Sequence, residues 1–494
     1  MPRVSDYTRE LRELIRKTGE ALDSYDKPIL LLAPTGYGKT TLSLALYKYL
    51  RDGGRDLGVR LIHVLPLRSI GDQLYQKAKG DDVGLQHMGF AGSPLLGKRF
   101  NITTLDTFIF SLFKLPPFEM GKVARGYSAH YEVSRGHIFS SIVVFDEIHL
   151  YFQNPKMSAS FLESLEVLSN ARVPMVLMTA TLPEEYKKEI KGVIDFEEIG
   201  PNAPDAVKSE VRFEKFDGDL IEKVNELRKN GSVAVMLNTV KRAVDVYKKI
   251  KKAVEEGGGG GEVVLIHGRL AEVDRAERVK KVNGELPKGM VVVTTQVVEA
   301  GVDFSADFGI TASAPPENLK QRAGRVNRYG KNERGTVYVL PPEEEDIKIY
   351  GERAGYFWKT GKLDMRADSP RVDKLLKTIL RQVNASMYLN SDTVYDYIRR
   401  ECSLTREEDV VSAVPVELLG YSSSSEIVGK KIDYDIEGKV IPLELKKGKY
   451  TVLYRDGRVG EYEFKYKCMS VEMMEENIVA VLVEGYDREV GLVG

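Results

Sequence analysis

The segment ILLLAPTGYGKTT, residues 29–41, decides the fold of this chain. Its first four residues, Ile29 to Leu32, are an unbroken apolar run, which predicts a strand buried on both faces, as in a parallel sheet. The run ends at a loop that contains two glycines, and the apolar spacing from Leu42 to Leu50 predicts a helix. A strand, a glycine-containing loop and a helix in this order are the arrangement that binds phosphate groups.

The loop residues have the chemistry of a phosphate cradle. Glycines let successive backbone N–H groups turn toward an anion, the helix N-terminus adds partial positive charge, and Lys39 reaches the outer phosphates. The Thr40 hydroxyl is placed to ligate Mg²⁺. The spacing is that of a Walker A loop with alanine in place of the first glycine. The predicted nucleotide-binding residues here are Ala33, Pro34, Thr35, Gly36, Tyr37, Gly38, Lys39 and Thr40.

Composition limits the class of protein. The chain has 494 residues, enough for two or three domains, and its 43% hydrophobic and 29% charged residues are typical of globular proteins. No apolar run approaches the roughly 18 residues of a membrane span, and no signal-peptide pattern opens the chain, so we expect no membrane partner and a cytoplasmic location. Lys and Arg (72) balance Asp and Glu (73), so a nucleic-acid site must be a local channel.

The chain has two cysteines, Cys402 and Cys468. They form no ligand-like pair, so we expect neither a zinc site nor a disulfide framework. We interpret both thiols as packing residues in a reducing compartment.

Further apolar runs indicate two α/β halves. Those of the first half each end in polar residues and are Leu61–Leu65, Phe100–Thr103, Ile142–Phe145 and Pro174–Met178. Because the carboxyl ends of parallel strands share one edge, where ligands bind, they predict one mononucleotide-binding domain, preceded by a helix over Val4–Leu22. The strands of the second half are Val233–Leu237, Val263–Ile266, Met290–Val293 and Ile310–Thr311, without a phosphate loop of their own.

Beyond Leu340 the pattern changes. Residues 347–400 have helical spacing, and an alternating hairpin follows from Tyr450 to Tyr466. We therefore predict an α/β protein with domains at 1–204 and 205–345 and a mixed α+β accessory domain at 346–494.

An acidic pair follows the apolar run that ends at Phe145. Asp146 can orient Mg²⁺, and Glu147 can position or deprotonate the water that attacks a nucleoside triphosphate. His149 lies at the right offset to link this pair to the polar loop Thr179–Thr181.

Three arginines, Arg322, Arg325 and Arg328, recur at three-residue spacing. This spacing places them on one helix face or in one tight turn. Phosphoryl transfer needs positive charge on the γ-phosphate, worth about 10³–10⁵ in rate when an arginine supplies it. We expect Arg325 and Arg328 to complete the site when the two halves close, as a motor requires.

Together these residues carry a resemblance to superfamily 2 DExH-box helicases. Motifs I, II, III, V and VI of that superfamily are matched in order by 33–40, 146–149, 179–181, 294–303 and 321–328. Arg68, Thr104 and the pair Asn238-Thr239 fall where motifs Ia, Ib and IV lie. Within the superfamily, ATLPEEY (180–186), TQVVEAGVDF (295–304) and APPENLKQRAGRVNRYG (314–330) resemble the CRISPR-associated helicase of type I interference systems.

The resemblance implies two RecA-like domains and ATP-dependent 3′→5′ translocation on single-stranded DNA, after recruitment by a CRISPR RNA-guided effector complex. It implies ATP and Mg²⁺ as cofactors, with Thr40 and Asp146 at the metal. Gln321, Arg325 and Arg328 would sense the γ-phosphate, Arg322 would assist coupling, and Asp303 would approach the ribose. The residues expected to touch the DNA backbone, which carries no sequence information, are Arg68, Thr104, Asn238, Thr239 and Thr295.

The chain departs from many members of that family, which carry an N-terminal HD nuclease. It has six histidines, no His-Asp dipeptide and no room for such a domain before Ile29. We therefore expect no nuclease activity from this polypeptide and a separate HD-type nuclease subunit.

Two other functions stay open. An RNA helicase of the DExH group uses the same motifs, since both kinds of enzyme track nucleic-acid backbones. A scaffold gated by bound nucleotide would need a damaged glutamate or arginine, and none of these residues is missing.

Overall fold

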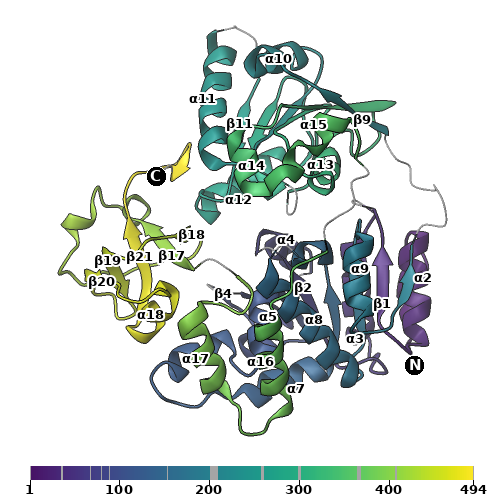
Figure 1. Ribbon diagram of the computed structural model, residues 1–494, viewed down its shortest axis with the longest axis vertical. Coiled ribbons are helices and arrows are strands. Elements are labelled where there is room, and N and C mark those ends of the chain that lie inside the picture. The colour runs from purple at the N-terminus through teal and green to yellow at the C-terminus, as the bar shows by residue number, and fades with distance from the viewer. Residues whose placement is uncertain are drawn as a thin grey trace. The chain divides into compact units, whose positions relative to one another are not determined.

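The computed structural model describes residues 2–34, 37–66, 68–78, 80–87, 90–152, 154–200, 210–256, 261–298, 302–363, 369–406 and 409–492. They form two compact units (Figure 1). Unit 1 contains Met1–Ala206, Arg366–Asp409 and Lys465–Asn477, and unit 2 contains Val207–Met365, Val410–Phe464 and Ile478–Gly494.

Unit 1 is built on an eight-stranded sheet in the order β4-β3-β5-β2-β6-β7-β1-β8. All pairs are parallel except β3 with β4. The strands are β1 (Ile29–Leu32), β2 (Arg60–Leu65), β3 (Val83–His87), β4 (Phe90–Ala91), β5 (Phe100–Thr104), β6 (Ser141–Phe145), β7 (Met175–Thr179) and β8 (Glu197–Ile199). The central strands are buried and mostly apolar because helices cover both faces of the sheet.

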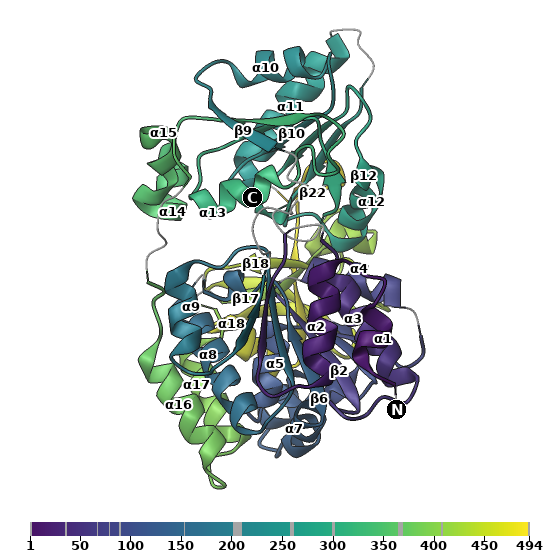
Figure 2. The ribbon, with the colours of Figure 1, turned by 90° about the vertical axis from the view of Figure 1, so that its right-hand side faces the viewer.

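Alternate residues of each strand enter different cores. On β6, Ile142 and Val144 pack in one core and Val143 and Phe145 in the other. The first core belongs to α1 (Val4–Thr8), α2 (Glu13–Asp23), α3 (Lys39–Arg51) and α4 (Arg68–Ala78). The second belongs to α5 (Leu105–Leu112), α6 (Met120–Val123), α7 (Tyr131–Phe139), α8 (Pro155–Asn170) and α9 (Glu184–Lys191). Figure 2 shows α1 to α3 and α8 on opposite sides of unit 1.

The predicted helix over Val4–Leu22 is wrong in one respect, because it is two helices. α1 folds back on α2, and the Val4 N–H donates to Asp23 Oδ1 at 2.6 Å. The close approach depends on Gly19, where an added Cβ would lie 2.0 Å from Thr8 Oγ1. A smooth apolar periodicity therefore hid a turn between the two helices.

Unit 2 contains a six-stranded parallel sheet in the order β11-β13-β10-β15-β16-β9. Its strands are β9 (Glu210–Lys215), β10 (Val233–Met236), β11 (Val263–Ile266), β13 (Val291–Thr294), β15 (Phe308–Thr311) and β16 (Arg334–Val339). Its helices are α10 (Leu220–Leu227), α11 (Val240–Glu256), α12 (Glu272–Val282), α13 (Pro316–Ala323), α14 (Glu344–Tyr350) and α15 (Tyr356–Thr360). A short parallel pair, β12 (Gly284–Glu285) and β14 (Phe304–Ser305), lies apart from this sheet.

A mixed sheet completes unit 2, in the order β18-β17-β21-β19-β20. Its strands are β17 (Val410–Pro415), β18 (Ile441–Glu444), β19 (Lys449–Tyr454), β20 (Val459–Glu463) and β21 (Ile478–Val483), and only β17 with β21 is parallel. A two-stranded ribbon, β22 (Tyr486–Asp487) with β23 (Gly491–Leu492), joins it to the parallel sheet. There the Tyr486 hydroxyl donates to Asp274 and accepts from the Ala271 N–H at 3.0 Å.

The two parallel sheets and the mixed sheet confirm the predicted class: two RecA-like α/β parts and a mixed α+β C-terminal part. The compact units follow packing and not chain order, so residues 346–494 contribute to both units. The domain boundaries predicted in chain order stay predictions.

The C-terminal segments of unit 1 are α16 (Lys374–Ala385), α17 (Ser391–Glu401) and α18 (Met469–Glu475). The expectation of two unpaired thiols is wrong, because Cys402, after α17, and Cys468, before α18, form a disulfide with 4.9 Å between their Cα atoms. The two residues lie 66 positions apart and meet because both segments pack into the second core of unit 1. Spacing along the chain carries no sign of that meeting. Among the described residues, no helix combines the length and apolar character needed to cross a membrane.

Candidate active site

The phosphate loop begins where β1 ends. The Ala33 N–H donates to the Thr179 carbonyl at 3.0 Å, so the loop starts beside the end of β7. Gly38 has φ +100°, a left-handed conformation that favours glycine, and it forms the N-cap of α3. The predicted residues Thr35 and Gly36 lie outside the described residues. The ring of Tyr37 stacks with the Arg12 guanidinium, 5.2 Å from the ring centre.

Lys39 opens α3 with its ammonium turned into the loop. The side chain is only 7% exposed, and Nζ donates to the Ala33 carbonyl at 3.1 Å. The same Nζ lies 3.4 Å from Glu147 Oε1. A buried cation at the mouth of this loop has the position and charge to bind a phosphate, and Thr40 follows it in the first turn of α3.

Asp146 is buried at the end of β6. Burial raises its pKa, but His63, Lys39 and the Glu147 N–H stabilise the carboxylate more strongly, and the net pKa lies below the ordinary value. Asp146 is therefore ionised at neutral pH. A carboxylate and a threonine hydroxyl are hard oxygen donors of the kind that Mg²⁺ prefers, so the chemistry of Asp146 and Thr40 fits this ion.

Glu147 occupies an unusual backbone conformation, with φ +49°. A residue other than glycine in this region costs of order 1 kcal/mol, and such costs gather at functional sites. The Oε1 and Oε2 atoms of Glu147 lie 3.4 Å from Lys39 Nζ and 3.5 Å from His149 Nδ1.

His149 joins the acidic pair to the loop after β7. Its Nδ1 lies 2.8 Å from Thr179 Oγ1, and that hydroxyl donates to the Thr181 carbonyl at 2.8 Å. Burial lowers the pKa of His149, so the ring is neutral at pH 7. Because the Thr179 hydrogen is given to Thr181, Nδ1 of His149 must be the donor. The structure thus places His149 in the contact expected between residues 146–147 and 179–181.

The three arginines of unit 2 have different environments. α13 ends at Ala323, so only Arg322 lies on a helix, and Arg325 and Arg328 lie in the turn that follows. Arg322 is fully buried and donates to Thr311 Oγ1 at 2.9 Å and to the Ala312 carbonyl at 3.2 Å. It binds protein groups, and its expected part in coupling stays a prediction.

Arg328 and Asp303 form an ion pair at 3.2 Å, and the Tyr329 hydroxyl donates to the same Asp303 oxygen at 3.2 Å. Arg325 is buried, and its carbonyl accepts the Ala306 N–H at 2.9 Å. Gln321 precedes Arg322 on α13. The predicted ribose residue and one predicted γ-phosphate residue are thus partners within unit 2.

Asn238 lies at the centre of a buried network that the sequence did not reveal. Its amide donates to the Ser313 carbonyl at 2.8 Å and to Asp346 Oδ1 at 2.7 Å, while its Oδ1 accepts from Arg322 at 2.7 Å. The Tyr350 hydroxyl adds contacts of 3.3 Å to Gln296 and 3.4 Å to Arg322. α14 is therefore part of the packing that holds residues 238, 296 and 322.

The other predicted nucleic-acid residues vary in exposure. Arg68 begins α4, and its side chain lies outside the described part of the chain. Thr104 and Thr295 are 5% and 4% exposed, and Thr104 Oγ1 donates to Thr107 at 3.3 Å. Thr239 donates to Glu345 at 2.9 Å. Their contact with a nucleic-acid backbone stays a prediction.

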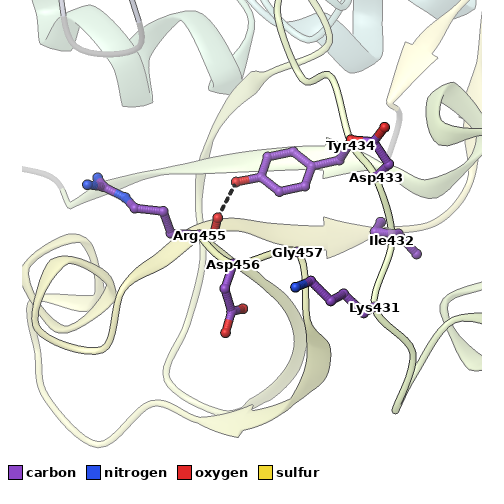
Figure 3. A pocket seen from close by; sticks show the side chains of 7 residues that line it. All are labelled: Lys431, Ile432, Asp433, Tyr434, Arg455, Asp456 and Gly457. Atoms are coloured by element: carbon purple, nitrogen blue, oxygen red, sulfur yellow. Dashed lines mark hydrogen bonds between the residues drawn. The ribbon is translucent and has the colours of Figure 1, made fainter.

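A hollow of about 350 Å³ lies on the mixed sheet of unit 2. It is lined by Lys431, Ile432, Asp433, Tyr434, Arg455, Asp456 and Gly457. Figure 3 shows that the charged ends of Lys431 and Arg455 do not converge. The Tyr434 hydroxyl donates a hydrogen bond to the Arg455 carbonyl at 3.0 Å. None of the predicted site residues lines it. In the described part of the chain, no group of three or more His, Cys, Asp or Glu is arranged to hold a metal.

Comparison with known proteins agrees with this geometry. A family model described as DEAD/DEAH box helicase matches residues 16–189, and one described as CRISPR-associated nuclease/helicase Cas3, C-terminal, matches residues 229–331. The CRISPR-associated helicase Cas3 of Thermoproteus tenax is 27% identical over 343 residues, which cover 65% of this chain and 57% of that protein. A putative CRISPR-associated nuclease/helicase Cas3 of Methanocaldococcus jannaschii is 28% identical over 374 residues, covering 65% and 47%.

The chain thus spans about half the length of these curated relatives. The crystal structure of T. fusca Cas3 has the same fold, with a TM-score of 0.65 at 17% identity, over 98% of this chain and 69% of that chain. The fold, the phosphate loop and the acidic pair of this chain resemble those of superfamily 2 DExH-box helicases. Within that superfamily, the chain resembles the CRISPR-associated helicase Cas3, the description shared by these relatives.

Proposed function

We propose that this chain is an ATP-dependent translocase that moves 3′→5′ along single-stranded DNA and unwinds target DNA in type I CRISPR interference. The observation that carries the proposal is the continuous line of contacts in unit 1 from Lys39 through Glu147 and His149 to Thr179. It links the residue that would bind phosphate to the loop that follows β7. A helicase needs such a link, because hydrolysis must change the conformation of the segments that hold the strand.

Each residue of unit 1 has a separate task in hydrolysis. Lys39 neutralises the outer phosphates, and Glu147, one-fifth exposed, positions or deprotonates the attacking water. Asp146 and the Thr40 hydroxyl hold the Mg²⁺ that accompanies ATP. When bound, this ion neutralises charge on the phosphates.

The arginines of unit 2 complete the proposed chemistry. Arg325 and Arg328 supply positive charge to the γ-phosphate in the transition state, with Gln321 beside them. Removing one such arginine lowers the rate by about 10³–10⁵ in related phosphoryl transfers. To reach the γ-phosphate, the Arg328 side chain must first leave its ion pair with Asp303. Because this pair is only partly buried, breaking it costs little.

The proposed partners are an RNA-guided CRISPR effector complex, single-stranded DNA and a separate HD-type nuclease, in the cytoplasm. The likeness to Cas3 helicases supports the effector complex and the DNA. The nuclease rests on the missing His-Asp dipeptide alone.

The test is ATP turnover by the purified chain with no nucleic acid, with single-stranded DNA and with single-stranded RNA. Lys39→Ala serves as the blank, and Lys320→Ala, an exposed change on α13, is the matched control. We expect stimulation by DNA only, loss of turnover in Lys39→Ala, and in Arg325→Ala a far larger loss of hydrolysis than of ATP binding. Duplexes with a 3′ or a 5′ tail then report polarity.

The outcomes separate the alternatives. Stimulation by RNA only would make the chain an RNA helicase with the same fold. No turnover in any condition would indicate a scaffold gated by nucleotide, and normal turnover by Arg325→Ala would refute the role of unit 2 in hydrolysis.

A further inference from the structure

His63 is a fully buried histidine on β2 whose two ring nitrogens face two different parts of the active site. Nδ1 lies 2.7 Å from the hydroxyl of Ser43, which is on α3 three residues after Thr40. Nε2 lies 3.4 Å from Asp146 Oδ2. The ring therefore bridges the helix of the phosphate loop and the carboxylate at the end of β6.

The geometry of this bridge gives each ring nitrogen a different neighbour. Nε2 faces the Asp146 carboxylate, and Nδ1 is hydrogen-bonded with the Ser43 hydroxyl. Among the described residues Nε2 has no hydrogen-bond partner, and it lies 3.4 Å from Asp146 Oδ2. A polar ring atom buried without a hydrogen bond costs about 1–3 kcal/mol, and the nearby Asp146 carboxylate offsets part of that cost by its charge.

We propose that His63 is a positioning residue that orients Asp146 for the divalent ion bound with ATP, an inference that rests on the proposed function. The other carboxylate oxygen, Oδ1, accepts the Glu147 N–H at 2.9 Å. Each of the two carboxylate oxygens of Asp146 thus has its own neighbour, the Glu147 N–H at Oδ1 and His63 Nε2 at Oδ2. Through Ser43, the same ring fixes Asp146 relative to the helix that carries Thr40, so both proposed Mg²⁺ ligands share one support.

Two other functions for this bridge fail on burial and packing. A Ser-His-Asp sequence of contacts suggests nucleophilic catalysis, but Ser43 is fully buried, so no substrate reaches its hydroxyl. A purely packing role would be filled by an apolar residue, because the neighbours Ile62 and Val64 are fully buried on the same parallel strand.

The experiment measures the affinity of the full chain for a fluorescent ATP analogue with and without Mg²⁺. The variants are His63→Phe, which fills the space without a donor, and His63→Gln, whose amide can again donate to Asp146. His137→Phe serves as control and changes a histidine of α7 whose Nδ1 lies 2.9 Å from the Leu95 carbonyl.

We expect the Mg²⁺ concentration for half-maximal tight binding to rise 10–100-fold in His63→Phe, the range found when a residue that supports a metal ligand is removed. Affinity without Mg²⁺ should change less than twofold. His63→Gln should recover most of the response, and Ser43→Ala, which frees Nδ1, should fall between wild type and His63→Phe. The thermal midpoint of each variant shows whether folding alone explains the change.

An unchanged Mg²⁺ response in His63→Phe overturns the inference, and so does an equal loss in His63→Gln and His63→Phe. If His63→Phe does not fold, Ser43→Ala and His63→Gln decide by the same measure. Wild-type binding of Mg²⁺ and nucleotide without DNA-stimulated turnover would refute the proposed function but not the role of His63.

Discussion

Replacement of Arg322 by alanine is the sharpest test of the network in unit 2. Its guanidinium is fully buried and donates to four oxygens, on Thr311, Ala312, Asn238 and Tyr350, at 2.7–3.4 Å. Arg322→Ala leaves these acceptors without their donor in a site that water does not reach. The damage therefore falls on the stability of unit 2.

The expected loss follows from the geometry of the contacts. A hydrogen bond from a charged group contributes about 1.5–3 kcal/mol, and only the contacts at 2.7 and 2.9 Å are short. Asn238 Oδ1 loses the donor that bonds it at 2.7 Å, while the Ala312 carbonyl still accepts from the Thr311 hydroxyl at 3.0 Å and tolerates the loss better. We expect Arg322→Ala to destabilise unit 2 by about 3 kcal/mol, which lowers its thermal midpoint by about 6–12 °C.

The assay is thermal and urea unfolding of the full chain, with ATP binding measured in parallel. Arg322→Met keeps the volume without donors and should lose nearly as much stability as Arg322→Ala. Arg322→Lys keeps the charge but replaces a planar fork by a point donor, which cannot reach Asn238 and Thr311 together, so it too should lose stability. Lys320→Ala, on the exposed side of α13, should lose none.

If Arg322→Ala unfolds at the same temperature and urea concentration as the wild type but has lost ATP turnover, this reasoning is refuted. Arg322 would then act on the nucleotide and not on its own unit. A loss of stability without any change in nucleotide affinity at low temperature would instead separate Arg322 from Arg325 and Arg328.

Two further predictions concern other parts of the chain. Burial lowers the pKa of His267 to about 4, below its ordinary value of 6.5, so folding favours the neutral ring, which donates to the Val490 carbonyl at 3.0 Å. About 3 kcal/mol of folding stability is therefore present above pH 6.5 and is lost as the pH falls toward 4. Hydrogen exchange at the Leu492 amide, compared between the wild type and His267→Gln, measures this loss. The Cys402–Cys468 disulfide closes a loop over 66 positions, so a reductant should destabilise the wild type by about 2–4 kcal/mol in thermal unfolding and leave the Cys402→Ser, Cys468→Ser double variant unchanged.

Several parallel strands could be predicted from the sequence, because a short unbroken apolar run is typical of a strand buried on both faces. The runs at 29–32, 61–65, 142–145 and 263–266 correspond to β1, β2, β6 and β11 within a residue. The edge strand β11 was readable, but the edge strands β8 and β9 were not. β8 has the sequence EEI and β9 has EVRFEK, and one exposed face lets such strands carry charge.

The candidate site likewise has residues that the sequence predicts and contacts that it does not. Motifs local in sequence located Lys39, Asp146, Glu147 and His149, because a loop or a strand end fixes their neighbours. The partners that hold these residues come from distant positions. Tyr350 lies 28 residues from Arg322, and nothing in its own surroundings on α14 indicates a contact with residues 296 and 322.

His63 shows why such residues escape sequence reasoning. Within the run LIHVL it interrupts a buried strand with one polar side chain, and by composition alone it is a flaw in the pattern. The strand register explains this polar residue. β2 lies beside β6, and His63 is opposite Val144, two residues before Asp146. A polar residue in a strand that must be apolar requires a buried partner, so it is a signal worth following even where the partner is unknown. Here that partner is the carboxylate at the centre of the proposed chemistry.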